Sequence, residues 1–340
     1  MLRIIFFADT HLGVDYPIKP KVELRRRGDD FFDNYKKVLD YAIESKADLV
    51  LHGGDFFFRS KVPSPIVDKA YDILYDFADY DIPFIIVPGN HERSALPTSI
   101  LMNHRNIHIF DEPQTMFFEK QKAIIGITGF PNIRNGIKLQ YEKIFEQATE
   151  GNPGVDIKLL LMHQAIQESQ IEGYTFRYGI DVLPLEMLPA DYHAVLSGHI
   201  HRAQIFQYEK EGKQIPVIYP GSTERTSIVE MAEEKGFYEL IFEETDNNWK
   251  LTETNFHILP TRPMVRIDIT KLTEDEKVLR NLLGAELSKI DPNAVVRLRC
   301  EFSETRKLLK ADLLRELTPK TMTLTLAPIY RKRYQIEKNN

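Results

Sequence analysis

The sequence is poor in the residues that build disulfide-linked and membrane-spanning proteins. It has one cysteine, Cys300, among 340 residues, so no internal disulfide and no thiolate cluster can form. No run of about 18 or more apolar residues is present to span a bilayer. Met1 leads directly into the strand-like Leu2 to Phe7, without the basic and then apolar pattern of a signal peptide. We therefore expect a cytoplasmic protein whose metal ligands are drawn from His, Asp, Glu and Asn.

The chain also lacks the overall positive charge common in proteins that wrap nucleic acid. It has 44 Lys and Arg against 50 Asp and Glu, a net charge of −6. The charge is unevenly distributed along the sequence. From Met264 onward there are 16 basic and 11 acidic residues, whereas residues 1–263 include 28 basic and 39 acidic residues. Divalent cations would offset part of the acidic portion, and the basic portion could contact phosphates.

The apolar pattern of the first two-thirds predicts strands alternating with helices. Six runs of strand length each end in a polar or glycine-containing turn: 3–8, 47–52, 83–87, 123–128, 158–162 and 193–196. Helix-like stretches with apolar residues at three- and four-residue spacing lie between the first three, at 30–45 and 64–80. Parallel strands joined by crossover helices collect ligands at their carboxyl ends, so we expect the chemistry there.

A second pattern begins near residue 262. Segments 214–219, 236–242 and 249–257 are typical of strands, and Pro260, Arg262 and Pro263 then interrupt the sequence. Strand-like 264–269, 294–300 and 322–326 follow, with helix-like 273–290 and 305–317 between them. We predict a large α/β domain over 1–262 with a β-rich core and outer helices, a small α/β domain over 263–328, and a polar tail over 329–340.

Five short polar clusters follow apolar strands. They are Ala8-Asp9-Thr10-His11, Gly53-Gly54-Asp55, Pro88-Gly89-Asn90-His91-Glu92, Met162-His163-Gln164 and Ser197-Gly198-His199-Ile200-His201. One histidine at a strand end is more often a core or surface group than a metal ligand. Five of the ten histidines lie in these clusters, however, and scattered structural histidines have no reason to select strand ends.

The spacing within the clusters suits metal chelation. On an extended segment, residues two apart point the same way, so Asp9 and His11 can hold one ion, and His199 and His201 repeat the spacing. The glycines before Asp55, Asn90 and His199 permit tight turns and close backbone approach. A carboxylate shared by two cations about 3.5–4 Å apart would help to set their distance, and Asp55 is the candidate.

In their order, these clusters resemble the motifs of the calcineurin-like metallophosphoesterase superfamily, D-x-H, GD, GNH[ED], H and GHxH. The resemblance spans about residues 9 to 201 and implies a four-layer fold, a mixed two-sheet β-sandwich flanked by helices. It also implies phosphoester hydrolysis by two metal ions. The implied ligands are Asp9, His11, Asp55 and His201 for one ion, and Asp55, Asn90, His163 and His199 for the other. His91 would be the catalytic acid that stabilises the transition state or protonates the leaving oxygen.

Within the superfamily, the stretches 5–13, 54–60 and Thr261-Arg262-Pro263 are similar to SbcD-type DNA double-strand-break repair nucleases. This resemblance covers about residues 1 to 328. It implies an Mn²⁺-dependent exo- or endonuclease acting on DNA, a small domain that caps the site, a homodimer, and an SMC-like ATPase partner of the SbcC type. This chain departs at Phe58, where relatives commonly have histidine or aspartate. Phe58 can act on a DNA strand only by stacking or packing, which leaves exonuclease activity on duplex ends open.

Three other functions fit part of the pattern. A protein phosphatase of the superfamily shares the cluster at 89–92, but such enzymes usually follow GD with a Val-Asp-Arg-Gly-like run, where this chain has Phe56 to Ser60. A small-substrate phosphodiesterase would leave the small domain without a role. A non-catalytic DNA-end-binding scaffold would need neither the ligand set nor His91. Mn²⁺ follows from the resemblance alone, since such ligands also accept Fe²⁺, Zn²⁺ or Co²⁺.

Overall fold

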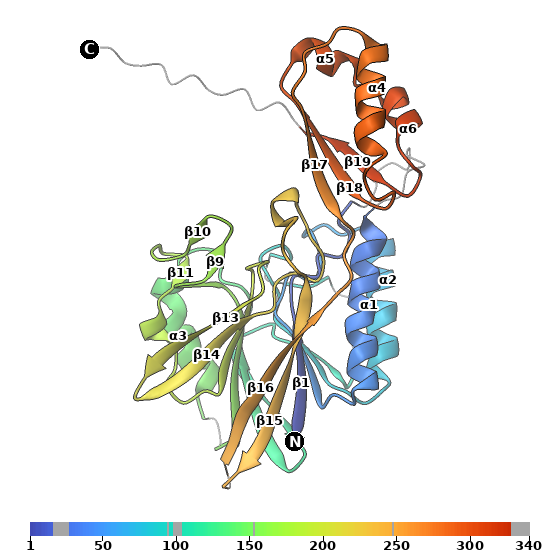
Figure 1. Cartoon of the computed structure of the whole chain (residues 1–340). Coiled ribbons are helices and arrows are strands. Elements are labelled where there is room, and N and C mark those ends of the chain that lie inside the picture. The colour runs from blue at the N-terminus through green and yellow to red at the C-terminus, as the bar shows by residue number, and fades with distance from the viewer. Residues whose placement is uncertain (16–26, 94, 98–103, 152–153, 247, 328–340) are drawn as a thin grey trace, which may run out of the picture. The chain divides into compact units, whose positions relative to one another are not determined.

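The chain divides into two units in the computed structural model (Figure 1). The larger contains Met1–Tyr16 and Gly28–Thr261, and the smaller contains Arg262–Asn340 with Pro17–Arg27. The structure describes residues 1–15, 27–93, 95–97, 104–151, 154–246 and 248–327, so the predicted tail over 329–340 lies outside it. Among these residues, no helix has the length and apolar character needed to cross a membrane.

Two six-stranded mixed sheets form the centre of the larger unit. The first has the order β16 (Asn248–Ile258), β15 (Gly236–Thr245), β1 (Leu2–Phe7), β2 (Leu49–His52), β3 (Phe84–Ile86) and β4 (Ile107–Ile109). Strands β1 to β4 are parallel, and β15 and β16 extend the sheet in antiparallel pairing. The crossovers predicted between β1, β2 and β3 are confirmed.

The second sheet repeats this arrangement with a parallel centre and antiparallel edges. Its order is β13 (Gln204–Lys210), β14 (Lys213–Tyr219), β12 (Ala194–Gly198), β7 (Ile157–His163), β6 (Ala123–Gly129) and β5 (Gln114–Lys120). Strands β14, β12, β7 and β6 are parallel, while β13 and β5 pair antiparallel. Short pairs join β8 (Ala165–Ile166) to β11 (Val182–Leu183) and β9 (Gln170–Ile171) to β10 (Tyr174–Thr175), and two 3₁₀ turns span Leu185–Met187 and Ile228–Glu230.

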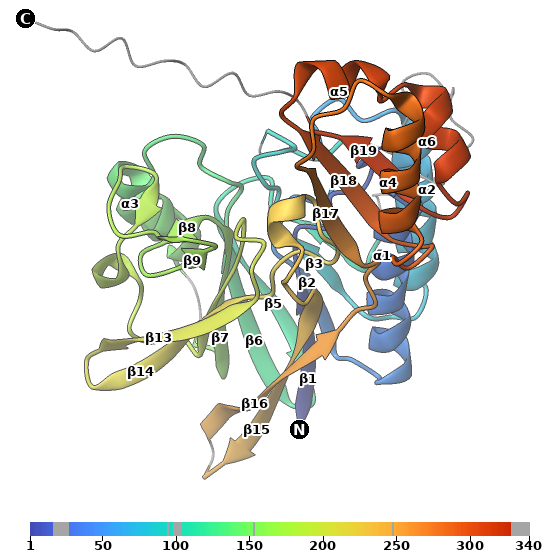
Figure 2. The same cartoon turned by 45° about the horizontal axis from the view of Figure 1, so that its top comes forward.

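Helices cover the outer face of each sheet (Figures 1 and 2). Helices α1 (Gly28–Glu44) and α2 (Ser64–Ala78) pack on the first sheet, where Phe7 contacts Tyr35 of α1. Alternate residues of β1 face inward, so Phe6 joins Leu159 of β7 in the core between the sheets. Helix α3 (Ile137–Thr149) covers the second sheet. The order helix, sheet, sheet, helix confirms the predicted four-layer fold.

The smaller unit is a three-stranded parallel sheet with helices. Its strands are β17 (Met264–Ile269), β18 (Val295–Cys300) and β19 (Thr323–Leu326), and its helices are α4 (Glu276–Leu287), α5 (Ser303–Leu308) and α6 (Ala311–Leu317). The prediction of one helix over 305–317 is wrong. The backbone leaves the helical region at Leu309, with ψ 61°, so this segment forms two short helices.

Candidate metal centre

All eight predicted site residues lie at or just after the carboxyl ends of parallel strands. Asp9 and His11 follow β1, Asp55 follows β2, Asn90 and His91 follow β3, His163 ends β7, and His199 and His201 follow β12. Backbone hydrogen bonds tie the first two loops together: the Asp9 N–H donates to the Gly54 carbonyl (2.9 Å) and the His11 N–H to that of Asp55 (3.0 Å). The fold thus brings residues from both sheets to one place.

The first group of possible ligands surrounds the Nε2 atom of His11. The His201 Nε2 lies 2.9 Å from it, an Asp9 carboxylate oxygen 4.0 Å and an Asp55 oxygen 3.9 Å. The side chains of His11 and Asp9 are fully buried. These four residues are the set that the resemblance implies for one metal ion.

The second group surrounds the Asn90 side-chain oxygen. The His199 Nδ1 lies 2.9 Å from it and the His163 Nε2 3.0 Å. Asp55 also belongs to this group, because its Oδ2 lies 3.4 Å from the His163 Nε2. Asp55 therefore lies in both groups, as a bridging carboxylate must.

Four of these residues have a backbone conformation that side chains disfavour. The φ angles of Asp9, His11, Asp55 and His199 are +52°, +44°, +52° and +85°. Each non-glycine residue held in this left-handed region costs on the order of 1–3 kcal/mol, and such costs gather at functional sites. The expectation that Asp9 and His11 share an extended segment is wrong, because their side chains converge through a tight turn instead.

The chemistry of the two groups fits bound cations. The His201 Nδ1 lies 3.3 Å from a Glu230 carboxylate oxygen, which can only accept, so its Nε2 presents a lone pair to the site. In the same way, His163 donates from Nδ1 to the Gly53 carbonyl (2.7 Å) and turns Nε2 inward. Ring lone pairs and carboxylate oxygens crowded together repel unless a cation or a proton lies among them. The described residues that could hold one include Asp9, His11 and His201 together.

The family model for calcineurin-like phosphoesterases matches residues 2–203, which include all eight residues. The chain belongs to this family. It is a hydrolase of phosphoesters, the family uses a dinuclear metal site, and the two groups described here are candidates for its ligands.

Individual relatives are more distant. The DNA double-strand break repair protein Mre11 of Archaeoglobus fulgidus is 28% identical over 245 residues, covering 67% of this chain and 52% of that protein. The protein of the same name from Saccharolobus solfataricus is 26% identical over 323 residues, covering 94% and 79%. The chain spans about half the length of the first relative. A solved dimetal phosphatase from Danio rerio, 10% identical, covers 70% of this chain and 92% of its own, with a TM-score of 0.44.

Burial and charge set the protonation of this phosphoesterase site when no cation is bound. Burial would raise the pKa of Asp55, but attraction to His163 outweighs it and holds that pKa below the usual range. Burial would lower the pKa of His163, but Asp55 raises it to about 9. Burial also raises the pKa of Asp9 to about 6, against attraction to His163 and His201. The metal-free cluster therefore holds a proton on His163 that a cation must displace.

His91 lies at the edge of the phosphoesterase site and is more accessible than the ligands. Its Nδ1 donates to the Phe58 carbonyl (2.6 Å), so Nε2 faces the cluster, 3.8 Å from Asp55 Oδ2. Its own N–H donates to Asp55 Oδ1 (2.9 Å). The Phe58 ring lies beside the rings of both His11 and His91, with centroids 5.9 and 5.7 Å away. His91 can thus offer a proton toward the site from a ring fixed by its other nitrogen.

Two supporting carboxylates were missed by the sequence reasoning. Glu92 is buried and accepts from the Phe57 N–H (2.6 Å) and the Gly89 N–H (2.9 Å), which clamps the loops after β2 and β3. Its position beside His91 in the GNHE cluster could have identified Glu92 from the sequence. Glu230 lies 29 residues beyond His201 in a segment without a motif, and no local pattern could have found it.

His52, which precedes Asp55 by three residues, is part of the core. It is fully buried, hydrogen-bonds Thr10 through Nε2 (3.1 Å) and accepts from the Gly54 N–H at Nδ1 (3.1 Å). Burial lowers its pKa to about 3, so it is neutral. These contacts give His52 a structural role beside the site.

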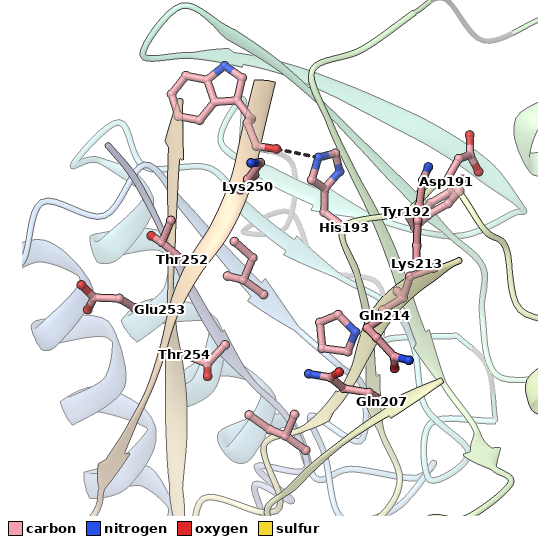
Figure 3. Close-up of a pocket in the computed structure, with 15 residues that line it drawn as sticks. Asp191, Tyr192, His193, Gln207, Lys213, Gln214, Lys250, Thr252, Glu253 and Thr254 are labelled. Carbon is pink, nitrogen blue, oxygen red and sulfur yellow. Dashed lines mark hydrogen bonds between the residues drawn. The ribbon is translucent and has the colours of Figure 1, made fainter. Parts of the chain in front are cut away.

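A groove of about 680 Å³ lies elsewhere in the larger unit, between β16 and the β13–β14 hairpin (Figure 3). Trp249, Leu251 and Ile215 contribute its apolar surface, and His193 donates across it to the Trp249 carbonyl (3.0 Å). Its lining comes from these strands and from the turn at 191–193, and not from the loops that carry the metal ligands. The groove therefore has no part in the phosphoesterase chemistry.

Proposed function

We propose that this phosphoesterase is a DNA nuclease. It would hydrolyse phosphodiester bonds at the two ligand groups described above with two divalent cations, Mn²⁺ by preference. The cations would be held by Asp9, His11, Asp55 and His201 on one side and by Asp55, Asn90, His163 and His199 on the other. When bound, they supply Lewis-acid charge that stabilises the negative charge developing on the attacked phosphate.

The protein's own groups supply positioning and a proton. His91 is fixed through Nδ1 by the Phe58 carbonyl and presents Nε2 toward the site, where it can protonate a departing sugar oxygen. Asp55 accepts the His91 N–H, and Asp9 accepts the His199 N–H (3.1 Å), so each carboxylate is held by the neighbouring motif. Such fixed donors need little rearrangement during the reaction.

Arginines without carboxylate partners are the main support for a nucleic-acid substrate. Arg59, Arg93 and Arg202 lie in the loops that bear site residues, and among the described residues none of them forms an ion pair. By contrast, Arg3 pairs with Glu239 and Arg105 with Asp81, both away from these loops. Unpaired arginines around a phosphoesterase site suit a polyanion that extends beyond one phosphate.

The remaining parts of the proposal follow from the relatives. Both Mre11 proteins are named for DNA double-strand break repair, and one alignment covers 94% of this chain. We assign residues 263–328 the role of a DNA-capping domain, and from Met264 to the end the sequence has 16 basic residues against 11 acidic ones. Homodimerisation and an SMC-like ATPase partner of the SbcC type belong to the same proposal.

The test is Mn²⁺-dependent cleavage of end-labelled single- and double-stranded DNA, with bis-p-nitrophenyl phosphate and a phosphopeptide as parallel substrates. His91→Ala is expected to reduce DNA cleavage about 10²- to 10⁴-fold while two Mn²⁺ remain bound. His104→Ala, which changes a histidine outside the cluster, serves as the control. Hydrolysis of the small ester or the phosphopeptide with intact DNA would contradict the nuclease assignment and leave the metal site standing.

A further inference from the structure

The segment that follows β14 wraps behind His201. The Ser222 N–H donates to the His201 carbonyl (3.1 Å). Gly221 has φ +74°, and a Cβ atom at this position would lie 2.7 Å from the same carbonyl oxygen. Glycine is therefore required for this close approach, which brings residues 222–235 against the back of the metal site.

A buried ion pair in this segment contacts both the ring and the backbone of His201. Glu230 and Lys235 are 8% and 1% exposed, and Lys235 Nζ lies 2.8 Å from Glu230 Oε2. Glu230 Oε1 is 3.3 Å from His201 Nδ1, and Lys235 Nζ donates to the His201 carbonyl (2.8 Å). Thr226 (2.5 Å) and Ser227 (3.3 Å) donate to the same Glu230 oxygen through their hydroxyl groups.

The cost of this arrangement points to a role beyond packing. Removing two charges from water is costly, and an apolar pair of similar volume is often as stabilising. Here both charged groups contact one residue, His201. A carboxylate that accepts from one ring nitrogen of a histidine leaves the other nitrogen unprotonated and fixes the ring plane. For His201, the unprotonated atom is Nε2, which faces His11 and Asp9.

We propose that Glu230, neutralised by Lys235, is a positioning residue that selects the Nδ1–H tautomer of His201 and aims its Nε2 at a cation. This inference rests on the metal site of the proposed function, but it does not depend on DNA as the substrate. The pair lies outside the five sequence motifs and acts on the metal only through His201.

The first measurement is the tautomer of His201 in metal-free protein, read from ¹⁵N shifts of the histidine rings at a pH where imidazoles are neutral. The His201 signals are assigned with His201→Gln. Glu230→Gln keeps the volume, and the double variant Glu230→Leu with Lys235→Met removes the pair without leaving a buried charge. We expect the wild-type ring to be Nδ1-protonated and the double variant to gain the Nε2-protonated form.

The second measurement is Mn²⁺ affinity and stoichiometry by calorimetry. Glu230→Gln is expected to weaken one of the two ions about 10- to 100-fold. Glu233→Gln is the matched control, because Glu233 also accepts from Lys235 (2.8 Å) but is not the carboxylate on the His201 ring. Its Mn²⁺ affinity should change less than about threefold.

The outcomes separate this inference from the function. A folded double variant with wild-type tautomer and Mn²⁺ affinity would overturn the positioning role of Glu230. Altered tautomer and affinity, in a protein that binds two Mn²⁺ but leaves DNA intact, would support the role and reject only the DNA nuclease. A wild-type chain that binds no divalent cation would overturn both.

Discussion

At the scale of single residues, the protonation of His163 links metal binding to pH. Its raised pKa, about 9, reflects the nearby Asp55 charge acting against burial, and the Asp9 pKa of about 6 reflects burial. Ligands must lose their protons to bind a cation. Between these two values, the site exchanges a proton for a metal ion.

Mn²⁺ affinity should therefore rise about tenfold per pH unit from pH 6 and level off near pH 9. Calorimetric titrations across this window check it, and a pH-independent affinity would contradict the assignment of the proton.

Metal-free protein should show the reverse trend in stability. A histidine whose pKa is raised from 6.5 to about 9 stabilises the fold below pH 6.5 and loses that contribution as pH rises through about 9. The loss is at most about 3 kcal/mol. Thermal unfolding in chelator at the two ends of the window measures it. A melting temperature that rises over this range would show that His163 is neutral without metal.

Phe58 offers a second residue-scale test, because it lies beside His91 and carries the Arg59 guanidinium over its ring, 5.7 Å from the centroid. Base stacking on an aromatic ring is worth about 1–3 kcal/mol. Phe58→Ala should raise KM for single-stranded DNA about 5- to 100-fold and change bis-p-nitrophenyl phosphate hydrolysis little. Phe117→Ala, at a distant exposed phenylalanine, is the control. Equal effects on both substrates would indicate a packing role instead.

At the scale of elements, the site depends on turns that follow the strands, and those turns depend on glycine. A Cβ atom at Gly89 would lie 2.2 Å from Asp55 Oδ1 and 2.3 Å from the Asp55 nitrogen. The loops after β2 and β3 can approach so closely only because position 89 has no side chain.

Gly89→Ala should accordingly displace Asp55 and weaken binding of both cations at least tenfold, since that carboxylate lies in both ligand groups. Gly154→Ala is a matched control, because a Cβ atom there meets nothing within 4 Å. Metal analysis after dialysis against limiting Mn²⁺ reports the difference. Full retention of two ions by Gly89→Ala would show that the turn can relax.

At the scale of the whole molecule, the eight site residues belong to the larger unit, and the smaller unit has its own core around Leu283 and Val296. The two therefore divide the proposed work into chemistry and DNA contact. Arg262 opens the smaller unit and is anchored within it, donating to the Thr321 carbonyl (2.9 Å).

A chain ending at Thr261 should keep two Mn²⁺ and hydrolyse bis-p-nitrophenyl phosphate at a rate close to that of the full chain. Its affinity for DNA should fall at least tenfold, because the truncation removes the basic portion. Fluorescence anisotropy with labelled DNA at constant salt measures this. Unchanged DNA affinity would place the binding surface in the larger unit alone.

Local sequence patterns were sufficient to predict much of the fold and the position of the site. The runs ending near Phe7, His52 and Ile86 predicted parallel strands, because chain-local apolar periodicity reflects burial. The polar motifs at the ends of these strands also indicated the site, because the end of a strand can be recognised from the local sequence. Helix α3 was not predicted, although Ile137, Tyr141 and Ala148 are buried at helical spacing.

The sequence by itself determined the family, the order of the elements and the residues to be examined as ligands. Only the tertiary structure decided how they meet: in left-handed turns at Asp9 and His11, with Glu92 clamping two loops and Glu230 behind His201. The physical reason is distance along the chain. A contact such as that between His11 and His201, 190 residues apart, depends on how two sheets pack, and no local pattern contains that information.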